Sequence, residues 1–550
     1  MNEERKEKEE RRKREIPGWK DEFDGRPQLP EESFGEFLEA KAARNRDKPY
    51  LYFEDRVVTY GALRDKVSQV ANGLLDLGVK KGEHVAIVMY NCPEYLYTIY
   101  ATNAIAAVHV TINPALKGEG LSYIINQSDS ETLVVEQECL ENIDLIKPDL
   151  KQLKRIIMLG NQDGANLPGG CVPFHKLYQG STSIPHIYRQ PGDLMRIHYT
   201  SGTTGLPKGT VARFAVASNY PRDKAQLKYQ HTADEIQYVI LPLYHNVGYM
   251  DCTARTLNVE TSCGLTRRFS ARRFWPEVRK FGCTCFSFAG SMPHILLKQP
   301  LHPDDKNHSM RFGDGYAPIG EIRDEFYDRF GVILIERYAT SDGGGGLRNI
   351  PGDKKGSIGR DEGGGRLVTI IDENGEECPP YVIGELVSRP RDGTAATAEY
   401  YKEPERTAEK VKGGWFHTGD YGYRDEEGWM FFSDRDRQFI RRRGENISSL
   451  EIESVIDKHP DVVESAAVGV SSEFQFDQEI KISVILKPGS KLTPEELIDW
   501  CQDKMARFMI PRYVDFRDCL PKTATERVQK HKLVDEGVTP TVWDREKTAA

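Results

Sequence analysis

Helix-like and strand-like segments alternate along this chain from about residue 33, and this alternation limits the possible folds more than any other feature. The segments 33–45 and 61–79 have the apolar spacing of amphipathic helices, whereas 50–60 and 84–90 have the composition of strands. Short branched apolar runs continue between helical segments at 93–113, 131–137 and 155–160. Such runs favour strands of a buried, largely parallel sheet, so the sequence predicts an α/β fold.

A smaller α+β region is expected to begin near residue 434. There 448–459 and 493–508 are typical of helices, and 464–472, 479–489 and 513–518 are typical of strands. Thr493 is a plausible N-cap, with Pro494 at the first helical position and Glu496 completing a capping box.

The chain has 550 residues, and single cores stop growing near roughly 250–300 residues. We therefore expect a large N-terminal domain of layered sheets and helices over 17–436 and a small C-terminal domain over 437–550. Residues 1–16 form a mixed-charge tail that is expected to be disordered or a frayed helix, with a membrane or partner arm as the alternative.

Composition excludes several classes of protein. A net charge of -9 argues against a nucleic-acid binder, which needs a basic face. No apolar run reaches the ~20 residues that span a bilayer, so no transmembrane segment is predicted. The N-terminal residues lack the apolar stretch of a secretion signal, so a cytoplasmic location is expected. Ten cysteines without a CxxC pair indicate neither a disulfide scaffold nor a zinc site.

The segment YTSGTTGLPKGT at 199–210 carries the clearest chemical signal. Its glycines let backbone N–H groups approach an anion closely, its hydroxyls add donors, and Lys208 adds a cation. This combination suits a polyphosphate, although a flexible Ser/Thr/Gly linker is the alternative. The segment lacks the GK[ST] ending of a Walker A loop, so a kinase or motor NTPase is disfavoured.

This segment resembles the phosphate loop of the adenylate-forming superfamily, which includes acyl-CoA synthetases, adenylation domains of peptide synthetases and luciferases. The similarity extends over roughly 33–537, through LPLYHNVG (241–248), GDGYAP (313–318), RYATSDGG (337–344) and GWFHTGDYGYRDEEGWMFF (414–432). Within this superfamily, the sequence most resembles carnitine or crotonobetaine-CoA ligases and very-long-chain acyl-CoA synthetases. No internal repeat is found.

The resemblance implies an enzyme that uses ATP and Mg2+ to activate a carboxylic acid as acyl-AMP, releases pyrophosphate and transfers the acyl group to coenzyme A. It also implies a C-terminal domain that moves between two poses. A carrier protein as acceptor, or a nucleotide-binding relative without turnover, remains an alternative. The identity of the acid and a homodimer remain open.

The resemblance also assigns roles to individual residues. The nucleotide would contact Thr200, Ser201, Gly202, Thr203, Thr204, Gly205, Lys208, Gly315, Tyr316, Ala317, Tyr338, Ala339, Ser341, Asp420 and Arg435. Among these, Tyr338 would stack on adenine and Asp420 would accept both ribose hydroxyls. The acyl pocket would be formed around His245, Tyr249 and Gly315. Asp342 would hold magnesium, Arg437 would be the hinge, and Arg443, Gly444 and Glu445 would meet coenzyme A.

Two positions depart from the family pattern. Asp342 stands where a glutamate is usual, which withdraws the carboxylate by about 1.5 Å. Arg527 stands in place of a lysine that bridges the substrate carboxylate and the α-phosphate, so the expected catalytic set is Lys208, His245 and Arg527. Arginine keeps the charge but has a broad planar head. Three nearby lysines could take the role of the missing lysine, namely Lys522, Lys530 and Lys532. The basic run Arg441 to Arg443 could form either a solvated face or a site for the phosphates of coenzyme A.

Overall fold

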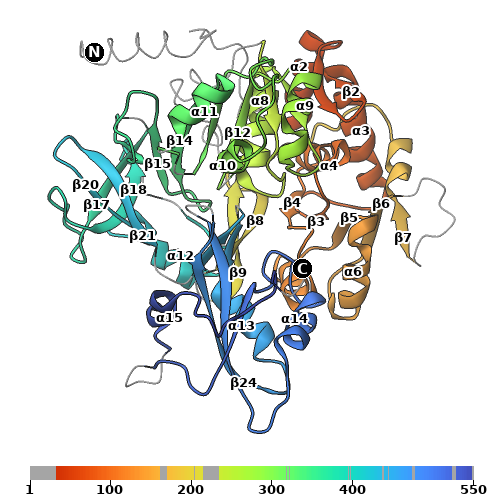
Figure 1. The fold of residues 1–550 in the computed structure, drawn as a ribbon. Helices are drawn as coiled ribbons and strands as arrows, with labels where there is room; N and C mark the ends of the chain where they lie inside the picture. Colours follow the sequence, from red (N-terminus) through yellow and green to blue (C-terminus); the bar gives the residue numbers. More distant parts are fainter. Residues whose placement is uncertain are drawn as a thin grey trace.

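A first sheet of seven strands forms one half of the N-terminal region in the computed structural model (Figure 1). Its order is β7-β6-β5-β3-β4-β8-β9, and all neighbours are parallel except the β8–β9 pair. The strands are β3 (His84–Val88), β4 (Val108–Thr111), β5 (Thr132–Glu136), β6 (Arg155–Leu159), β7 (Cys171–Pro173), β8 (Leu194–Gly202) and β9 (Gly205–Arg213). The associated helices are α3 (Tyr60–Asp76), α4 (Pro93–Ala104), α5 (Gly118–Gln127) and α6 (Leu140–Ile146), with short 3-10 turns η1 (Gln137–Cys139), η2 (Lys147–Asp149) and η3 (Phe174–Gln179).

The structure describes residues 32–160, 170–202, 205–214, 234–290, 292–317, 319–320, 322–363, 365–393, 396, 398–435, 439–443, 445–473, 477–522 and 528–547. The predicted N-terminal tail therefore lies outside the described residues. Within them, no helix is long and apolar enough to cross a membrane.

A second sheet of eight strands has the order β15-β14-β13-β12-β10-β11-β1-β2, parallel in its interior with antiparallel edges. The strands are β1 (Pro49–Phe53), β2 (Arg56–Thr59), β10 (Ile236–Val239), β11 (Ser262–Leu265), β12 (Cys285–Ala289), β13 (Phe312–Tyr316), β14 (Ile333–Ala339) and β15 (Gly345–Asn349). The helices are α2 (Phe34–Asn45), the π-helix η4 (Val247–Ala254), α8 (Arg255–Val259), α9 (Ala271–Phe281), α10 (Met292–Leu297) and α11 (Arg323–Phe330). The predicted alternation of helices and buried parallel strands is confirmed.

A third, antiparallel sheet has the order β16-β21-β20-β18-β17, with β19 paired to β20. Its elements are β16 (Gly359–Arg360), β17 (Arg366–Ile371), β18 (Gly384–Pro390), β19 (Val411–Lys412), β20 (Trp415–Arg424), β21 (Trp429–Arg435) and the helix α12 (Pro404–Lys410). After β17 the chain turns at Gly375, which has a φ of 83° and whose N–H donates to the Asp372 carbonyl. The pair Asn374 and Gly375 is a typical sequence signal for a tight turn, and the structure confirms a turn there.

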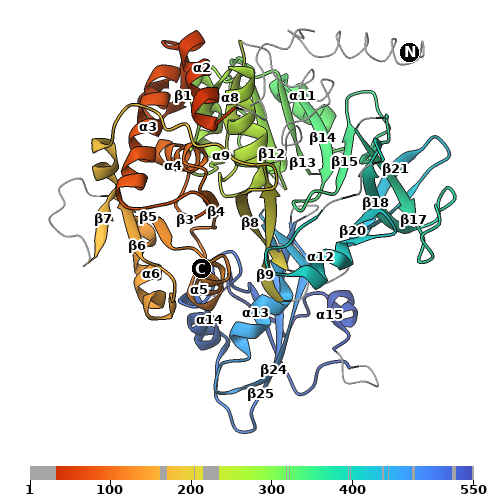
Figure 2. The same cartoon turned by 180° about the vertical axis from the view of Figure 1, so that it is seen from behind.

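The C-terminal elements form a separate layer, drawn in blue in Figures 1 and 2. They are β22 (Phe439–Arg442), β23 (Glu445–Ser448), α13 (Ser449–Ile456), β24 (Val462–Ser471), β25 (Gln478–Leu486), α14 (Pro494–Gln502), β26 (Tyr513–Arg517), α15 (Lys530–Glu536) and β27 (Trp543–Asp544). The capping box of Thr493 with Glu496 is present at the start of α14, as predicted. Isoleucines of α13 pack with β25 and α14 in a core of their own.

The change of layer falls between β21, which ends at Arg435, and β22, which begins at Phe439. The predicted domain boundary at 436/437 and the hinge Arg437 lie outside the described residues, so both remain predictions.

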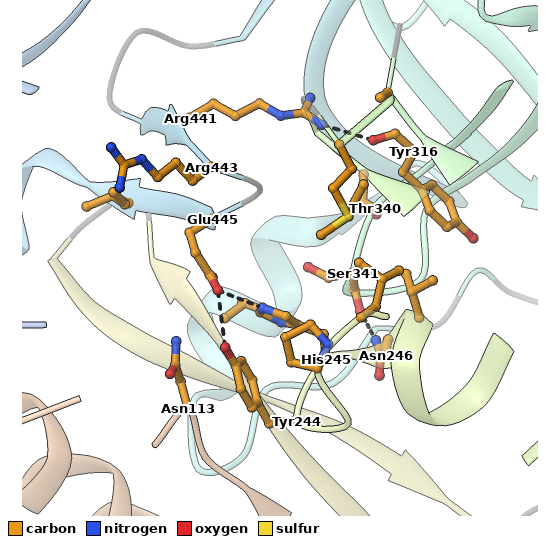
Figure 3. A pocket seen from close by; sticks show the side chains of 18 of the residues that line it. Asn113, Tyr244, His245, Asn246, Tyr316, Thr340, Ser341, Arg441, Arg443 and Glu445 are labelled. Atoms are coloured by element: carbon orange, nitrogen blue, oxygen red, sulfur yellow. Dashed lines mark hydrogen bonds and ion pairs between the residues drawn. The ribbon is translucent and has the colours of Figure 1, made fainter. Parts of the chain in front are cut away.

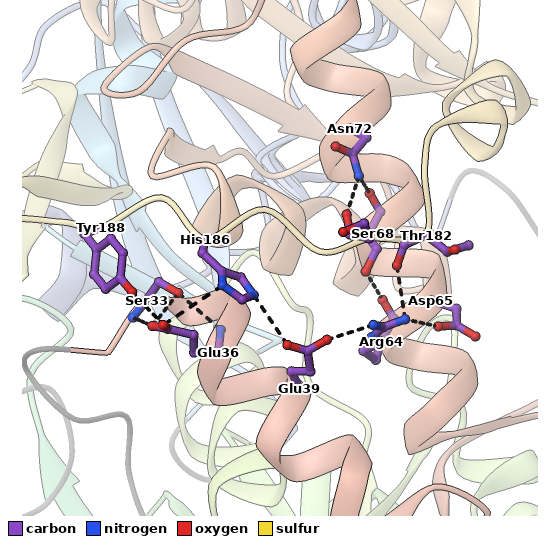
Figure 4. A network of polar contacts seen from close by, with 11 residues as sticks. Ser33, Glu36, Glu39, Arg64, Asp65, Ser68, Asn72, Thr182, His186 and Tyr188 are labelled. Atoms are coloured by element: carbon purple, nitrogen blue, oxygen red, sulfur yellow. Dashed lines mark hydrogen bonds and ion pairs between the residues drawn. The ribbon is translucent and has the colours of Figure 1, made fainter.

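A polar network fixes the segment that leads into β8 (Figure 4). Arg64 of α3 donates to the Thr182 carbonyl at 3.0 Å, and the Asn72 side chain donates to the carbonyls of Ser181 and Ser183 at 2.9 and 2.8 Å. Tyr188 donates to Glu36 of α2 at 2.5 Å. The first three bonds satisfy backbone carbonyls of an irregular segment, and together the four bonds tie the segment that precedes β8 to α2 and α3.

Candidate functional site

A cavity of about 1400 Å³ lies where the second sheet, the β8–β9 hairpin and the C-terminal layer meet. Its walls include the ends of β8, β13 and β14, Asp420 in the middle of β20, the segment around His245, and the β22–β23 hairpin (Figure 3). Because residues from both the N- and C-terminal regions line it, the cavity depends on the packing of the two regions against each other.

The 199–210 segment is mostly strand and not an open loop. Thr200 on β8 is the register partner of Lys208 on β9, and Thr200 lines the cavity. This regular pairing excludes the flexible linker that the composition allowed. Ser201, Gly202 and Gly205 lie at the turn end of the hairpin, and Thr203 and Thr204 lie outside the described residues.

The Lys208 ammonium lies near Tyr400, with Nζ 5.4 Å from the centre of the ring. Burial lowers the pKa of Lys208, and the nearby cations Arg406 and Lys410 of α12 lower it further. Three cationic side chains therefore lie close together beside the hairpin, an arrangement that suits a polyanion.

Tyr338 and Asp420 meet at the cavity wall. The Tyr338 hydroxyl donates to Asp420 Oδ2 at 2.8 Å, and Asp420 is only 1% exposed. Tyr338 lies near the end of β14, and Asp420 lies on β20, so the pair joins the second and third sheets. Arg435 on β21 is the register partner of Asp420.

Asp342 lies just after β14 and is bonded by two other side chains. The Tyr400 hydroxyl donates to Asp342 Oδ2 at 2.6 Å, and Lys410 Nζ is 3.4 Å from the same oxygen. Burial opposes ionisation, but Lys410, Tyr400 and Thr340 together hold the pKa of Asp342 below its ordinary value. The adjacent Ser341 accepts a bond from the Asn246 side chain at its carbonyl, at 2.7 Å.

His245 and Glu445 connect the two regions across the cavity (Figure 3). His245 Nε2 is 3.1 Å from Glu445 Oε1 on β23, and the Tyr244 hydroxyl donates to the same oxygen at 3.4 Å. Nearby, Arg441 of β22 donates to the Tyr316 carbonyl at 3.0 Å. His245 was predicted for the acyl pocket and Glu445 for the coenzyme A site, and the structure places the two side chains in direct contact.

The charge state of this pair predicts a pH dependence. Burial disfavours the protonated form of His245, but the Glu445 carboxylate more than offsets this and raises the pKa of His245 above its ordinary value. Burial likewise disfavours the ionised form of Glu445, but His245 more than offsets this and lowers the pKa of Glu445. A raised histidine pKa adds to the free energy of unfolding. This contribution is fully present below about pH 6.5, the pKa of histidine in the unfolded chain, and is lost as the pH rises through the pKa in the folded protein. On the acid side, the stability from Glu445 is lost as the pH falls through its lowered pKa.

We therefore expect Glu445→Gln to lower the pKa of His245, because the imidazolium loses its carboxylate partner. NMR titration of the His245 Cε1–H signal, assigned with His245→Asn, measures this. An unchanged titration in Glu445→Gln would contradict the pairing.

The run Arg441 to Arg443 does not form one solvated face. Arg442 is 1% exposed, donates to the carbonyls of Phe508 and Ile510, and pairs with Glu479 at 2.7 Å. Arg441 and Arg443 line the cavity instead. The solvated-face alternative is therefore wrong for Arg442, because β22 alternates its side chains between the C-terminal core and the cavity.

Two of the residues predicted for the acyl pocket do not line this cavity. The Tyr249 hydroxyl accepts a bond from the Asn103 side chain at 3.2 Å, and its ring packs 5.4 Å from that of His109 in the core. A Cβ on Gly315 would lie 2.2 Å from the Phe288 carbonyl oxygen, so glycine is needed for the contact between β12 and β13. The neighbouring Val247 and Met250 of η4 line the cavity.

The other predicted positions divide into two groups. Tyr316, Ala317, Ala339 and Ser341 line the cavity, whereas Arg437, Gly444 and Arg527 lie outside the described residues. Tyr400, Lys410 and Asn246 were not among the residues predicted for the site. The only signal for the first two is their position in AEYYKEPERTAEK, just before the recognised 414–432 block.

Comparison with known proteins decides the family. A family profile described as AMP-binding enzyme matches residues 38–401, and the profile of the AMP-binding enzyme C-terminal domain matches 451–527. The chain belongs to the AMP-binding enzyme family. A relative in this family, a crotonobetaine/carnitine–CoA ligase from Salmonella heidelberg strain SL476, is 32% identical over 507 residues, which is 88% of this chain and 96% of the relative.

Solved structures agree with the fold of this AMP-binding enzyme. An o-succinylbenzoate CoA synthetase from Bacillus subtilis, a double mutant bound to a product analogue, superposes with a TM-score of 0.77 at 22% identity, covering 92% of this chain and 99% of the other. An anthranilate CoA ligase in complex with anthranoyl-AMP gives a TM-score of 0.68 at 26% identity and covers 92% and 98% of the two chains. The large N-terminal α/β region with a smaller C-terminal domain is thus confirmed.

Proposed function

We propose that this enzyme is an ATP-dependent acyl-CoA ligase that forms an acyl-AMP, releases pyrophosphate and transfers the acyl group to coenzyme A. The family, and relatives named as CoA ligases, support this assignment. The observation that carries it is one cavity lined by the buried Tyr338–Asp420 pair, by His245 and by Glu445 of the C-terminal domain. Nucleotide and acyl chemistry can thus share one space that both domains enclose.

The proposed nucleotide contacts follow from the geometry. A buried carboxylate that already accepts one hydroxyl can accept ribose hydroxyls, which is the role we assign to Asp420. The Tyr338 ring beside it would stack on adenine, and Lys208 with its neighbouring cations would bind the phosphates. Mg2+ would accompany the phosphates of ATP, which are its usual ligands in such sites. No protein nucleophile is needed, because the thiol attacks the acyl-AMP directly.

Two of the three alternatives proposed for the lysine role have other partners, and the third, Lys532, is exposed on α15. Lys522 pairs with Glu464 at 2.8 Å, and Lys530 pairs with Glu453 at 2.7 Å, so both ammonium groups are bonded within the C-terminal domain. Arg527 therefore stays our proposed contact to the substrate carboxylate and α-phosphate. Arg443, Gly444 and Glu445 stay the proposed contacts to coenzyme A. A cytoplasmic location stays a prediction, and a homodimer stays open.

The decisive experiment measures AMP release over short, branched, aromatic, steroidal, long-chain and betaine-type acids, with and without coenzyme A. We expect at least one acid to give AMP release that requires ATP, Mg2+ and coenzyme A together, with a thioester product. Pyrophosphate exchange without a thioester would indicate another acceptor. Nucleotide binding without exchange for any acid would indicate a relative that has lost turnover.

We expect Lys208→Ala to lower kcat/KM for ATP by on the order of 10²-fold, because a charged donor to the phosphates is lost. Lys208→Arg keeps the charge and should lose less. Steady-state kinetics with varied ATP measure both variants, and unchanged ATP kinetics in Lys208→Ala would exclude a phosphate contact.

A further inference from the structure

One oxygen of the Asp342 carboxylate, Oδ2, is engaged by the protein itself. Oδ2 accepts from the Tyr400 hydroxyl at 2.6 Å and faces Lys410 Nζ at 3.4 Å. The side chains of Asp342 and Lys410 are only 13% and 21% exposed. The nearby Thr340 side chain also helps to keep the pKa of Asp342 below its ordinary value. Asp342 is therefore an anion with a hydrogen-bond donor and a cation already in place.

The Lys410 ammonium is held as firmly as the carboxylate. Nζ donates to the His417 carbonyl at 3.0 Å and to the Thr418 carbonyl at 3.1 Å, and Asp342 Oδ2 is its third oxygen neighbour. An ammonium has three N–H donors, and here three oxygens surround it. Lys410 ends α12, while His417 and Thr418 lie on β20 just before Asp420. Backbone carbonyls of β20 thus hold the Lys410 ammonium close to Asp420, the proposed ribose contact.

These residues do not fit a magnesium ion held by the protein. Mg2+ takes oxygen ligands at about 2.0–2.1 Å in octahedral geometry, and a carboxylate oxygen that faces an ammonium cannot also bind a divalent cation without repulsion. The shorter aspartate in place of a glutamate also withdraws the carboxylate towards the backbone. Among the residues that the structure describes, no group of three or more His, Cys, Asp and Glu side chains could hold a metal.

We infer that Lys410 is the built-in cation of Asp342, and that Mg2+ enters this site bound by the ATP phosphates and not by Asp342. Lys410 acts as a positioning residue, because it fixes Asp342, which accepts from Tyr400. The Tyr400 ring in turn faces Lys208 Nζ at 5.4 Å. The inference rests on the proposed use of ATP.

The test measures how much Mg2+ strengthens ATP binding. Calorimetry without an acid substrate, so without turnover, gives the dissociation constants of ATP with Mg2+ and with EDTA. Their ratio is the magnesium enhancement. We compare wild type, Asp342→Asn, Lys410→Met and the double variant; Lys410→Gln, which keeps a donor for the carbonyls, replaces Lys410→Met if that variant unfolds.

We expect Asp342→Asn to leave the enhancement within about twofold of wild type, as for two sites that do not interact. In the Lys410→Met background the carboxylate no longer faces a cation, so Asp342→Asn should lower the enhancement by about tenfold. A tenfold loss in the wild-type background would overturn the inference, because the metal would then be on Asp342. No loss in the Lys410→Met background would also overturn it, because Lys410 would not be what excludes the metal.

Failure of the proposed ATP site gives a different result, namely that wild type binds neither form of ATP. Mn2+ titration of the nucleotide-free protein, followed by electron paramagnetic resonance, then tests Lys410 independently. A Mn2+ site that appears in Lys410→Met and is lost in the double variant supports the inference. A wild-type Mn2+ site that is lost in Asp342→Asn, or no Mn2+ site in Lys410→Met, overturns it.

Discussion

Replacement of Asp420 by alanine should lower kcat/KM for ATP by on the order of 10²–10⁴-fold. A hydrogen bond to a charged group contributes about 1.5–3 kcal/mol, and Asp420 is proposed to accept two from the ribose. Two such bonds amount to about 3–6 kcal/mol, and each 1.4 kcal/mol corresponds to a tenfold change. Steady-state kinetics at varied ATP, together with calorimetry of AMP binding, measure the loss.

The matched control is Tyr338→Phe, which removes the donor to Asp420 but keeps the ring. Its expected loss is about tenfold, because one hydrogen bond disappears while stacking remains. Both residues are buried, so thermal unfolding must show that each variant is folded. If folded Asp420→Ala keeps its kcat/KM for ATP within threefold of wild type, Asp420 does not bind the ribose.

Replacement of Arg442 by methionine should destabilise the C-terminal domain by about 3–5 kcal/mol, the usual cost of breaking a buried ion pair by removing one partner. The change leaves Glu479 without its 2.7 Å partner and removes the donor to the carbonyls of Phe508 and Ile510. Denaturant unfolding, followed by tryptophan fluorescence to which Trp500 and Trp543 beside the core of the same domain contribute, measures the change.

Two variants separate this effect from a general loss of charge. Arg443→Ala removes the next arginine, which is exposed, and should change the unfolding free energy by less than about 0.5 kcal/mol. The double variant Arg442→Met with Glu479→Met should recover most of the stability, because apolar pairs often replace buried ion pairs well. If Arg442→Met has the same free energy of unfolding as Arg443→Ala, the structural role of Arg442 is contradicted.

Local patterns were sufficient to predict most of the fold. The helices and strands of both regions have the apolar periodicity that burial on one or both faces requires, and the Thr493 capping box is a signal within four residues. The α/β class, the C-terminal α+β domain and the turn near Gly375 could all be predicted in this way. The family resemblance added a set of residues, of which Tyr338 and Asp420 prove to be in contact.

Contacts between distant segments could not be predicted. Asp342 meets Tyr400 and Lys410 only because the third sheet folds back on the end of β14, and no local pattern encodes that approach. The burial of Arg442 depends on the segment around Phe508 and Ile510, far along the chain. Tyr249 was expected at the acyl pocket, but η4 is a π-helix, whose wider turn follows no simple sequence rule and changes which side chains face the cavity.

The wall of the cavity has a consequence for how the protein is made. The residues that line the cavity run from Tyr90 to Asp535, so part of the lining, including Glu445, comes from the C-terminal region of the chain. Domains generally fold in order from the N-terminus as they leave the ribosome. The first two sheets can therefore form while the cavity is still open on one side. Only a finished polypeptide encloses it, so a nascent or truncated chain would expose the proposed acyl-AMP site to water.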